Sequence, residues 1–334
     1  MDWRLKNESK TMKILLFIGI AFFRFISVSS AQDFINLLHH AQHELEQQQY
    51  VKAFQALSEA YDLSTDQSQE RIEVLIALGH FYAKVGGFGD AEGCFRKALQ
   101  INPYEFSALM GLGDIHFRRK EFLNARHAYE RARKYHPKQA QVYAAIATTF
   151  YEKAQTMEAA HYYQKALALD PDDIFSWNNL GIIYYGKLQF AEALKSWQTA
   201  LKLDKQSQIL HNNLAILFRD LGKPALSELH FRHAMGTASD DPAVLSNYAN
   251  LLFDKRKTEQ AKHYLRLAKQ KDSSPVYSNN LAVMERFTGE ILGAGVQYSQ
   301  TLEQARFYSN ARFHSRFFER RSQKIREALH GSKE

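Results

Sequence analysis

The sequence predicts an all-α fold, a solenoid built from a stack of helix pairs, behind an N-terminal export signal. Three observations predict it: a residue pattern that recurs every 34 positions, few glycines and prolines, and a short apolar segment near the N-terminus. With 16 glycines and 6 prolines in 334 residues, long helices are favoured over a turn-rich β fold. Hydrophobic residues make up 45% and charged residues 24%, as expected of a folded chain.

Residues 1–31 have the order of a secretory signal peptide: a basic flank, an apolar run over residues 14–23, and small residues ending at Ala31. We expect cleavage after Ala31, with Met12 as a possible start of translation. We therefore expect a periplasmic or secreted protein. The alternative is a membrane anchor formed by residues 14–28, although a spanning helix needs about 20 apolar residues and Arg24 interrupts this run.

Cysteine content and charge distribution exclude several kinds of site and partner. A single cysteine, Cys94, excludes an intramolecular disulfide framework and a cysteine-cluster metal site. The net charge of +7 comes from the ends: residues 1–31 carry five basic and two acidic side chains, and residues 306–326 carry seven and one. The body between them is near neutral, so we expect no nucleic-acid partner.

The repeat carries a small residue, a second small residue 12 positions later, an aromatic residue after four more, and an alanine after a further three. Three of the repeats then close with a proline. The five clearest repeats read as follows: Gly79, Ala91, Phe95, Ala98 and Pro103; Gly113, Ala125, Tyr129, Ala132 and Pro137; Ala147, Ala159, Tyr163, Ala166 and Pro171; Gly181, Ala193, Trp197 and Ala200; Ala215, Ser227, Phe231 and Ala234.

This pattern resembles the tetratricopeptide repeat family in period and in the offsets of its small, aromatic and proline positions. The resemblance implies a right-handed superhelix whose first helices line a concave face. The physical roles agree: small residues allow two helices to cross closely, and aromatic residues fill the space between neighbouring pairs. Proline marks the start of the next pair. Gly86, Gly222 and Gly289 fall at turns between helices, where a left-handed residue favours glycine.

Weaker repeats extend the register to about eight helix pairs over residues 34–308, with four residues, Gln69 included, inserted after the first pair. The eighth unit is marked by Ala282, Ala294 and Tyr298. Residues 309–334 then form a basic helix and tail, and the helix is expected to cap the exposed end of the stack.

Asparagines recur on the expected first helices in the C-terminal half. One stands at the same register position in four successive repeats, and a second polar residue precedes it. The ladder resembles that of the O-linked N-acetylglucosamine transferase superhelices, which implies a surface that holds an extended polypeptide; a carboxamide can donate to and accept from any peptide backbone. The alternative is a structural role, bonding the neighbouring helix. The candidate partner-binding residues are Asn178, Asn179, Asn212, Asn213, Asn247, Asn279 and Asn280.

Other candidate sites are weaker. The ladder position holds Ala77, Gly111 and Ala145 in the earlier repeats. A carboxylate clamp, another binding mode of the family, needs cations at the preceding position, and Ile76, Met110 and Ala144 stand there instead, followed by two of the asparagines. His39 and His43 share a helix face, but a zinc site needs a third ligand, so we read them, with His40, as solvated. We predict no metal, no cofactor and no catalytic residue.

Arginines run along one face of the C-terminal helix at intervals of four. Arg312, Arg316 and Arg320 either form the solvated side of a cap or contact an anionic partner, a lipid headgroup or an acidic protein. The sequence as a whole predicts a non-catalytic adaptor in the cell envelope that binds protein partners. Alternatives are an assembly or stability factor for a surface fibre, such as a type IV pilus, and a non-catalytic subunit of a polysaccharide secretion or glycosyltransferase complex. Pilotins of such pili resemble the chain in repeat content but carry a lipidated cysteine.

Overall fold

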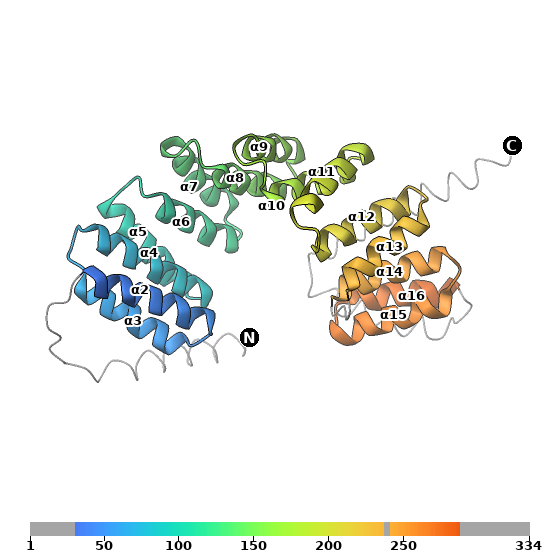
Figure 1. Cartoon of the computed structure of the whole chain (residues 1–334), viewed down its shortest axis with the longest axis horizontal. Helices are drawn as coiled ribbons and strands as arrows, with labels where there is room; N and C mark the ends of the chain where they lie inside the picture. The colour runs from blue at the N-terminus through green and yellow to red at the C-terminus, as the bar shows by residue number, and fades with distance from the viewer. Residues whose placement is uncertain (1–30, 237–240, 288–334) are drawn as a thin grey trace. The chain divides into compact units, whose positions relative to one another are not determined.

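A computed structural model describes residues 31–236 and 241–287, and in these ranges the regular structure is entirely helical (Figure 1). The chain divides into two compact units, unit 1 up to Lys153 and unit 2 from Ala154. Unit 1 contains α2 (Ala31–Glu46), α3 (Tyr50–Leu63), α4 (Gln69–Lys84), α5 (Phe88–Ile101), α6 (Phe106–Arg118), α7 (Phe122–Tyr135) and α8 (Ala140–Glu152). Unit 2 contains α9 (Thr156–Leu169), α10 (Ile174–Gly186), α11 (Phe190–Leu203), α12 (Gln208–Asp220), α13 (Pro224–Met235), α14 (Pro242–Asp254), α15 (Thr258–Lys271) and α16 (Pro275–Phe287).

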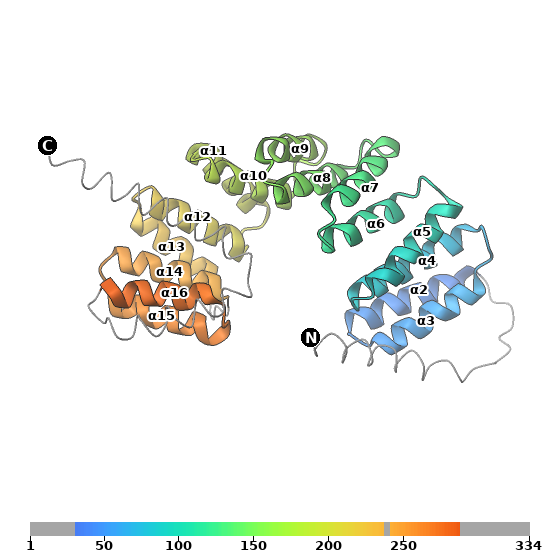
Figure 2. The ribbon, with the colours of Figure 1, turned by 180° about the vertical axis from the view of Figure 1, so that it is seen from behind.

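Consecutive helices form hairpins within each unit, and the pairs stack on one another. Helices α2 and α3, α4 and α5, and α6 and α7 pair in unit 1; α10 and α11, α12 and α13, and α14 and α15 pair in unit 2 (Figures 1 and 2). The even-numbered helices from α4 to α14 are the first members of the predicted repeats. The predicted all-helical fold of paired, stacked helices is therefore confirmed.

The repeat positions form the core of both units. The alanine that ends each clear repeat is fully buried in all five cases: Ala98, Ala132, Ala166, Ala200 and Ala234. The aromatic residues three positions earlier are buried as well, for example Phe95 and Phe231. For Phe95, the ring is inaccessible because the first helices of its own and the next repeat both pack against it.

Phe95 shows why two first-helix positions require glycine. A methyl group added to Gly79, in the same repeat, would lie 2.6 Å from Cε1 of Phe95. One added to Gly111, in the next repeat, would lie 2.9 Å from Cε2 of the same ring and closer still to two other ring atoms. The ring thus fills the space between two first helices, α4 and α6, as predicted for the aromatic position.

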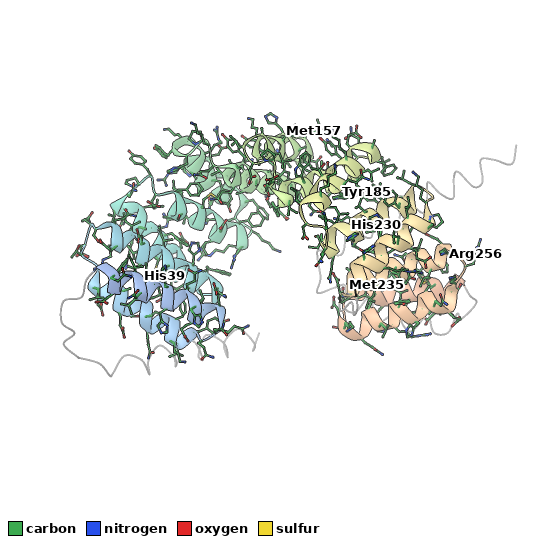
Figure 3. All side chains as sticks on the ribbon, in the orientation of Figure 1. His39, Met157, Tyr185, His230, Met235 and Arg256 are labelled. Atoms are coloured by element: carbon green, nitrogen blue, oxygen red, sulfur yellow. The ribbon has the colours of Figure 1, made fainter. Side chains whose placement is uncertain are left out.

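In seven of the described helix pairs, the residue two positions before the second helix adopts a left-handed backbone conformation. Gly86 and Gly222 have φ of 85° and 68°, as predicted for glycine at this turn. In the other repeats, however, residues with side chains adopt the same conformation, with φ between 58° and 63°. Figure 3 labels one of these residues, Arg256. The set is Gln48, Lys120, Ala154, Leu188 and Arg256.

Several predicted features lie outside the described residues. These are the signal segment up to residue 30, Gly289, and the chain from residue 288, which includes the second helix of the predicted eighth repeat and the predicted capping helix. Among the described helices, none combines the length and the apolar composition that a membrane span requires.

Candidate partner-binding site

The seven asparagines predicted to bind a partner lie on first helices of unit 2, and we call them the amide row. Helix α10 carries Asn178 and Asn179, and the same two positions recur on α12, on α14 and on α16. Ser246 replaces the first asparagine on α14. All seven asparagines are half-buried, so each side chain keeps contact with solvent.

Hydrogen bonds connect the amide row from one repeat to the next. Nδ2 of Asn213 donates to Oδ1 of Asn178 over 2.9 Å, and Nδ2 of Asn247 donates to Oδ1 of Asn212 over 3.2 Å. The third bond, 3.1 Å long, runs from Nδ2 of Asn280 to Oγ of Ser246. Each bond joins the ladder position of one first helix to the preceding position of the first helix before it. The amide row therefore contributes to the packing between repeats, which supports the structural role.

The same amides keep unused hydrogen-bonding groups. A carboxamide offers two N–H donors and an oxygen that can accept twice, and each inter-repeat bond uses one donor and one acceptor site. Asn279 makes no side-chain hydrogen bond within the described residues, and Asn179 donates only to the carbonyl oxygen of Phe175 in its own helix, over 2.8 Å. Donors and acceptors that make no hydrogen bond within the described residues therefore recur along the amide row.

Apolar side chains accompany the amide row one helical turn earlier. Phe175, Ile209 and Val276 are 54%, 63% and 38% exposed, and each stands four residues before a ladder asparagine. Residues four apart lie on the same side of a helix. Three of these first helices, α10, α12 and α16, therefore present amides beside large exposed apolar side chains. On α14 the equivalent position holds Ala243.

Polar contacts also join the C-terminal ends of these first helices. The hydroxyl of Tyr185, labelled in Figure 3, donates to Oδ2 of Asp220 on α12. Arg219 pairs with Asp220 over 3.2 Å and with Asp254 on α14 over 3.8 Å. Both Arg219 and Asp220 are largely buried, so this network fixes α10, α12 and α14 relative to one another and holds the amide row in register.

In unit 1 the equivalent positions are small or apolar. Ala77, Gly111 and Ala145 occupy the ladder position, and Ile76, Met110 and Ala144 precede them. These positions therefore provide neither an amide row nor the cations of a carboxylate clamp.

The N-terminal histidines surround a carboxylate. Glu44 is only 8% exposed, and His40, His43 and Lys52 each place a nitrogen between 3.5 and 3.9 Å from its oxygens. His39 lies on the same helix and is exposed (Figure 3). In the described residues, no group of three or more histidine, cysteine, aspartate or glutamate side chains is arranged to hold a metal ion.

A second histidine cluster, which the sequence did not predict, joins α12 to α13. Nδ1 of His211 lies 2.9 Å from Nδ1 of His230, and the ring of His233 stacks on that of His211. Burial, with smaller contributions from His211 and His233, lowers the pKa of His230 to about 4. Near neutral pH His230 is therefore uncharged and stabilises the hairpin. The three residues share no repeat position, so the spacing of residues in the sequence gave no signal for this cluster.

Arg312, Arg316 and Arg320, predicted to contact an anionic partner, lie outside the described residues.

Comparisons with known proteins show a matching family and solved structures of similar fold. The family model described as "Cilia and flagella-associated protein 70 C-terminal domain" matches residues 33–287. No curated protein matches the chain. Among solved structures, a Pseudomonas aeruginosa protein, PilF, is 20% identical with a TM-score of 0.57, over 66% of this chain and 98% of that one.

Two further solved structures show the same likeness. A tetratricopeptide repeat protein from Parabacteroides merdae is 14% identical with a TM-score of 0.58, over 76% of this chain and 99% of that one. The APC/C hetero-tetramer Cut9–Hcn1 contains a chain that is 19% identical with a TM-score of 0.60, over 75% of this chain and 52% of that one. At these identities the likeness concerns the fold alone. Because the family model covers most of the chain, the chain belongs to the family of the Cilia and flagella-associated protein 70 C-terminal domain and is a tetratricopeptide repeat protein.

Proposed function

We propose that the chain is a non-catalytic scaffold and that unit 2 binds an extended segment of a partner protein along the amide row. Tetratricopeptide repeat proteins generally bind other proteins, and they are generally not catalysts. One observation carries the more specific proposal: a row of half-buried carboxamides keeps free donors and acceptors beside exposed apolar side chains.

The chemistry of the row suits a polypeptide backbone. Peptide N–H and C=O groups recur along an extended chain, and carboxamides can pair with both whatever the partner's side chains are. The inter-repeat bonds hold Asn213 and Asn247 in place before a partner arrives, which reduces the entropy lost on binding. Phe175 and Ile209 supply apolar surface for some of the partner's side chains. The proposal thus gives the amide row both roles, joining repeats and binding a partner.

The test separates binding from stability by choosing the two asparagines that make no bond between repeats. A partner is captured from a cell extract with the wild-type chain and then titrated against Asn179→Ala/Asn279→Ala. Each lost hydrogen bond costs about 0.5–1.5 kcal/mol, so affinity should fall roughly ten-fold or more, with an unchanged melting temperature.

Gln198→Ala is the matched control, because it removes an exposed carboxamide from the second helix α11 of the same unit. It should leave both affinity and melting temperature unchanged. A well-folded double variant that binds the partner as tightly as wild type does would remove the amide row from the binding mechanism.

We further propose that the chain acts in the cell envelope, on the basis of the signal-like order of residues 1–31 and the basic residues near the C-terminus. A surface-fibre assembly factor and a polysaccharide-complex subunit are the two specific forms of this proposal, and the identity of the captured partner distinguishes them. Fractionation with N-terminal sequencing should find a mature chain outside the cytoplasm, beginning near Gln32. An intact N-terminus in the cytosol contradicts the envelope proposal.

A further inference from the structure

A cavity of about 270 Å³ in unit 1 is lined by side chains from three helices. Arg96 comes from α5, His116 from α6, and Asn124, His127 and Arg131 from α7; Leu112 is one of its apolar residues. No carboxylate belongs to this lining. The cavity is formed entirely within unit 1 and is separate from the amide row, so the inference does not rest on the proposed function.

Two acidic residues that contact side chains of the lining are already paired. Glu92 pairs with Arg96 over 2.8 Å and also with Arg119, so two guanidinium groups share one carboxylate. Glu121 accepts from Nδ1 of His116 over 2.6 Å, and this hydrogen bond, the largest cause, lowers the pKa of Glu121. These carboxylates therefore leave the positive charge of the lining only partly neutralised.

Two further residues of the lining have spare donors. Arg131 forms no ion pair with any described residue, and its one hydrogen bond, from Nη2 to the carbonyl oxygen of Pro103, is long at 3.4 Å. His127 is exposed and makes no side-chain hydrogen bond or ion pair in the part of the chain that the structure describes. A guanidinium has five N–H donors in a planar fork, so most of the donors of Arg131 are free for a ligand.

We propose that this cavity binds a phosphate monoester. Donors from α5 and α7 line it, and a phosphate group offers at least three acceptor oxygens and nearly two negative charges, whereas a carboxylate offers two oxygens and one charge. The volume of about 270 Å³ lies just below the range of typical ligand sites, which span about 300–1,000 Å³. It therefore suits a phosphate group with a few attached atoms, in a small molecule or on a phosphorylated side chain, rather than a large cofactor.

The test is calorimetric titration of the full chain at constant ionic strength. The probes are O-phosphoserine, which presents an esterified phosphate, inorganic phosphate, and acetate as the carboxylate control. We expect O-phosphoserine to bind at least ten-fold more tightly than acetate does. Inorganic phosphate that binds as tightly as O-phosphoserine does would overturn the monoester proposal in favour of free phosphate, and equal binding of all three probes would overturn phosphate recognition altogether.

Variants on α5 and α7 test whether the binding takes place in the cavity. Arg131→Gln should weaken O-phosphoserine binding at least ten-fold, and Arg96→Gln provides a second variant on α5. Lys134→Gln removes the same charge from α7 at an exposed position outside the lining, and it should bind as wild type does. Circular dichroism confirms that each variant is folded. Equal losses in Arg131→Gln and Lys134→Gln would show that the affinity reflects the net charge of α7, and would contradict a site in the cavity.

Discussion

Unit 1 and unit 2 are built on the same repeat but join their first helices differently. In unit 1 the ladder position holds a small residue, and at Gly111 the ring of Phe95 approaches so closely that no side chain fits. In unit 2 the ladder position holds an asparagine, and amide hydrogen bonds link one first helix to the next, as between Asn213 and Asn178. One unit thus joins its repeats by packing at this position and the other by hydrogen bonding.

The way in which the first helices are joined determines which polar groups each unit has left to bind a ligand or partner. An apolar contact between helices is complete once the helices have packed, whereas a carboxamide that bonds its neighbour still offers a donor and an acceptor. In the proposed function, unit 2 therefore uses the same residues for stability and for binding a polypeptide. Unit 1 instead carries the polar groups of the proposed phosphate site on α5 and α7, where Arg96, His127 and Arg131 line a cavity.

The largest effect on stability is expected at the packed contact between Phe95 and Gly111 in unit 1. Gly111→Ala places a methyl group against the ring of Phe95, and overpacking of this kind costs about 1–3 kcal/mol. Gly93→Ala makes the same chemical change on α5, where an added methyl group meets no atom within 4 Å. It should stabilise the chain by about 1 kcal/mol, because alanine favours helix over glycine. Chemical denaturation measures the free energy of unfolding of both variants.

Equal shifts in the two variants would contradict the close contact between Phe95 and α6. They would also show that the ladder position at Gly111 tolerates a side chain, which would remove the physical basis of the comparison.

The sequence predicted the parts of the fold that follow directly from the repeat. Small residues such as Ala166 and aromatic residues such as Phe95 stand at fixed offsets, so the helix pairs and their buried positions could be read from the spacing. Gly111 lies outside the repeat pattern. Its need for glycine arises from the ring of a residue 16 positions earlier, and no local pattern contains that information.

The candidate site was predictable in its residues but not in its bonds. The register placed Asn178 and Asn213 on successive first helices. Which atoms meet depends on how those helices are rotated and offset, and the spacing of residues does not specify this. The cavity in unit 1 was missed for a related reason: Arg96 and Arg131 occupy different positions of their repeats, so no periodic pattern connects them.

The second prediction concerns the turn that both units share. Lys120 in unit 1 and Leu188 in unit 2 adopt φ of 62° and 63°, a conformation that costs residues with side chains roughly 1–2 kcal/mol. Part of any gain from glycine is lost to its greater freedom in the unfolded chain. Lys120→Gly and Leu188→Gly should therefore each stabilise the chain by about 0.5–1 kcal/mol in chemical denaturation.

Gly222→Ala is the reverse change at the equivalent turn and should destabilise the chain by a similar amount. Because the turn is common to both units, Lys120→Gly and Leu188→Gly should give equal gains. A gain in one unit only would mean that the units differ in their turns as well as in how their first helices are joined.

The smallest expected effect concerns the amide bond between Asn178 and Asn213. A double-mutant cycle compares Asn178→Ala, Asn213→Ala and the double variant by their free energies of unfolding. A hydrogen bond between neutral groups contributes about 0.5–1.5 kcal/mol, and since both side chains are half-buried we expect a coupling at the low end, about 0.5 kcal/mol. Asn179 and Asn213 provide the control cycle, because they lie on the same two helices without a bond between them, and their coupling should fall within the error of the measurement. If the two cycles give the same coupling, the amide bond does not join the repeats in solution. The asparagines of unit 2 would then be free to serve a partner alone, and the stability of the stack would rest on packing in both units.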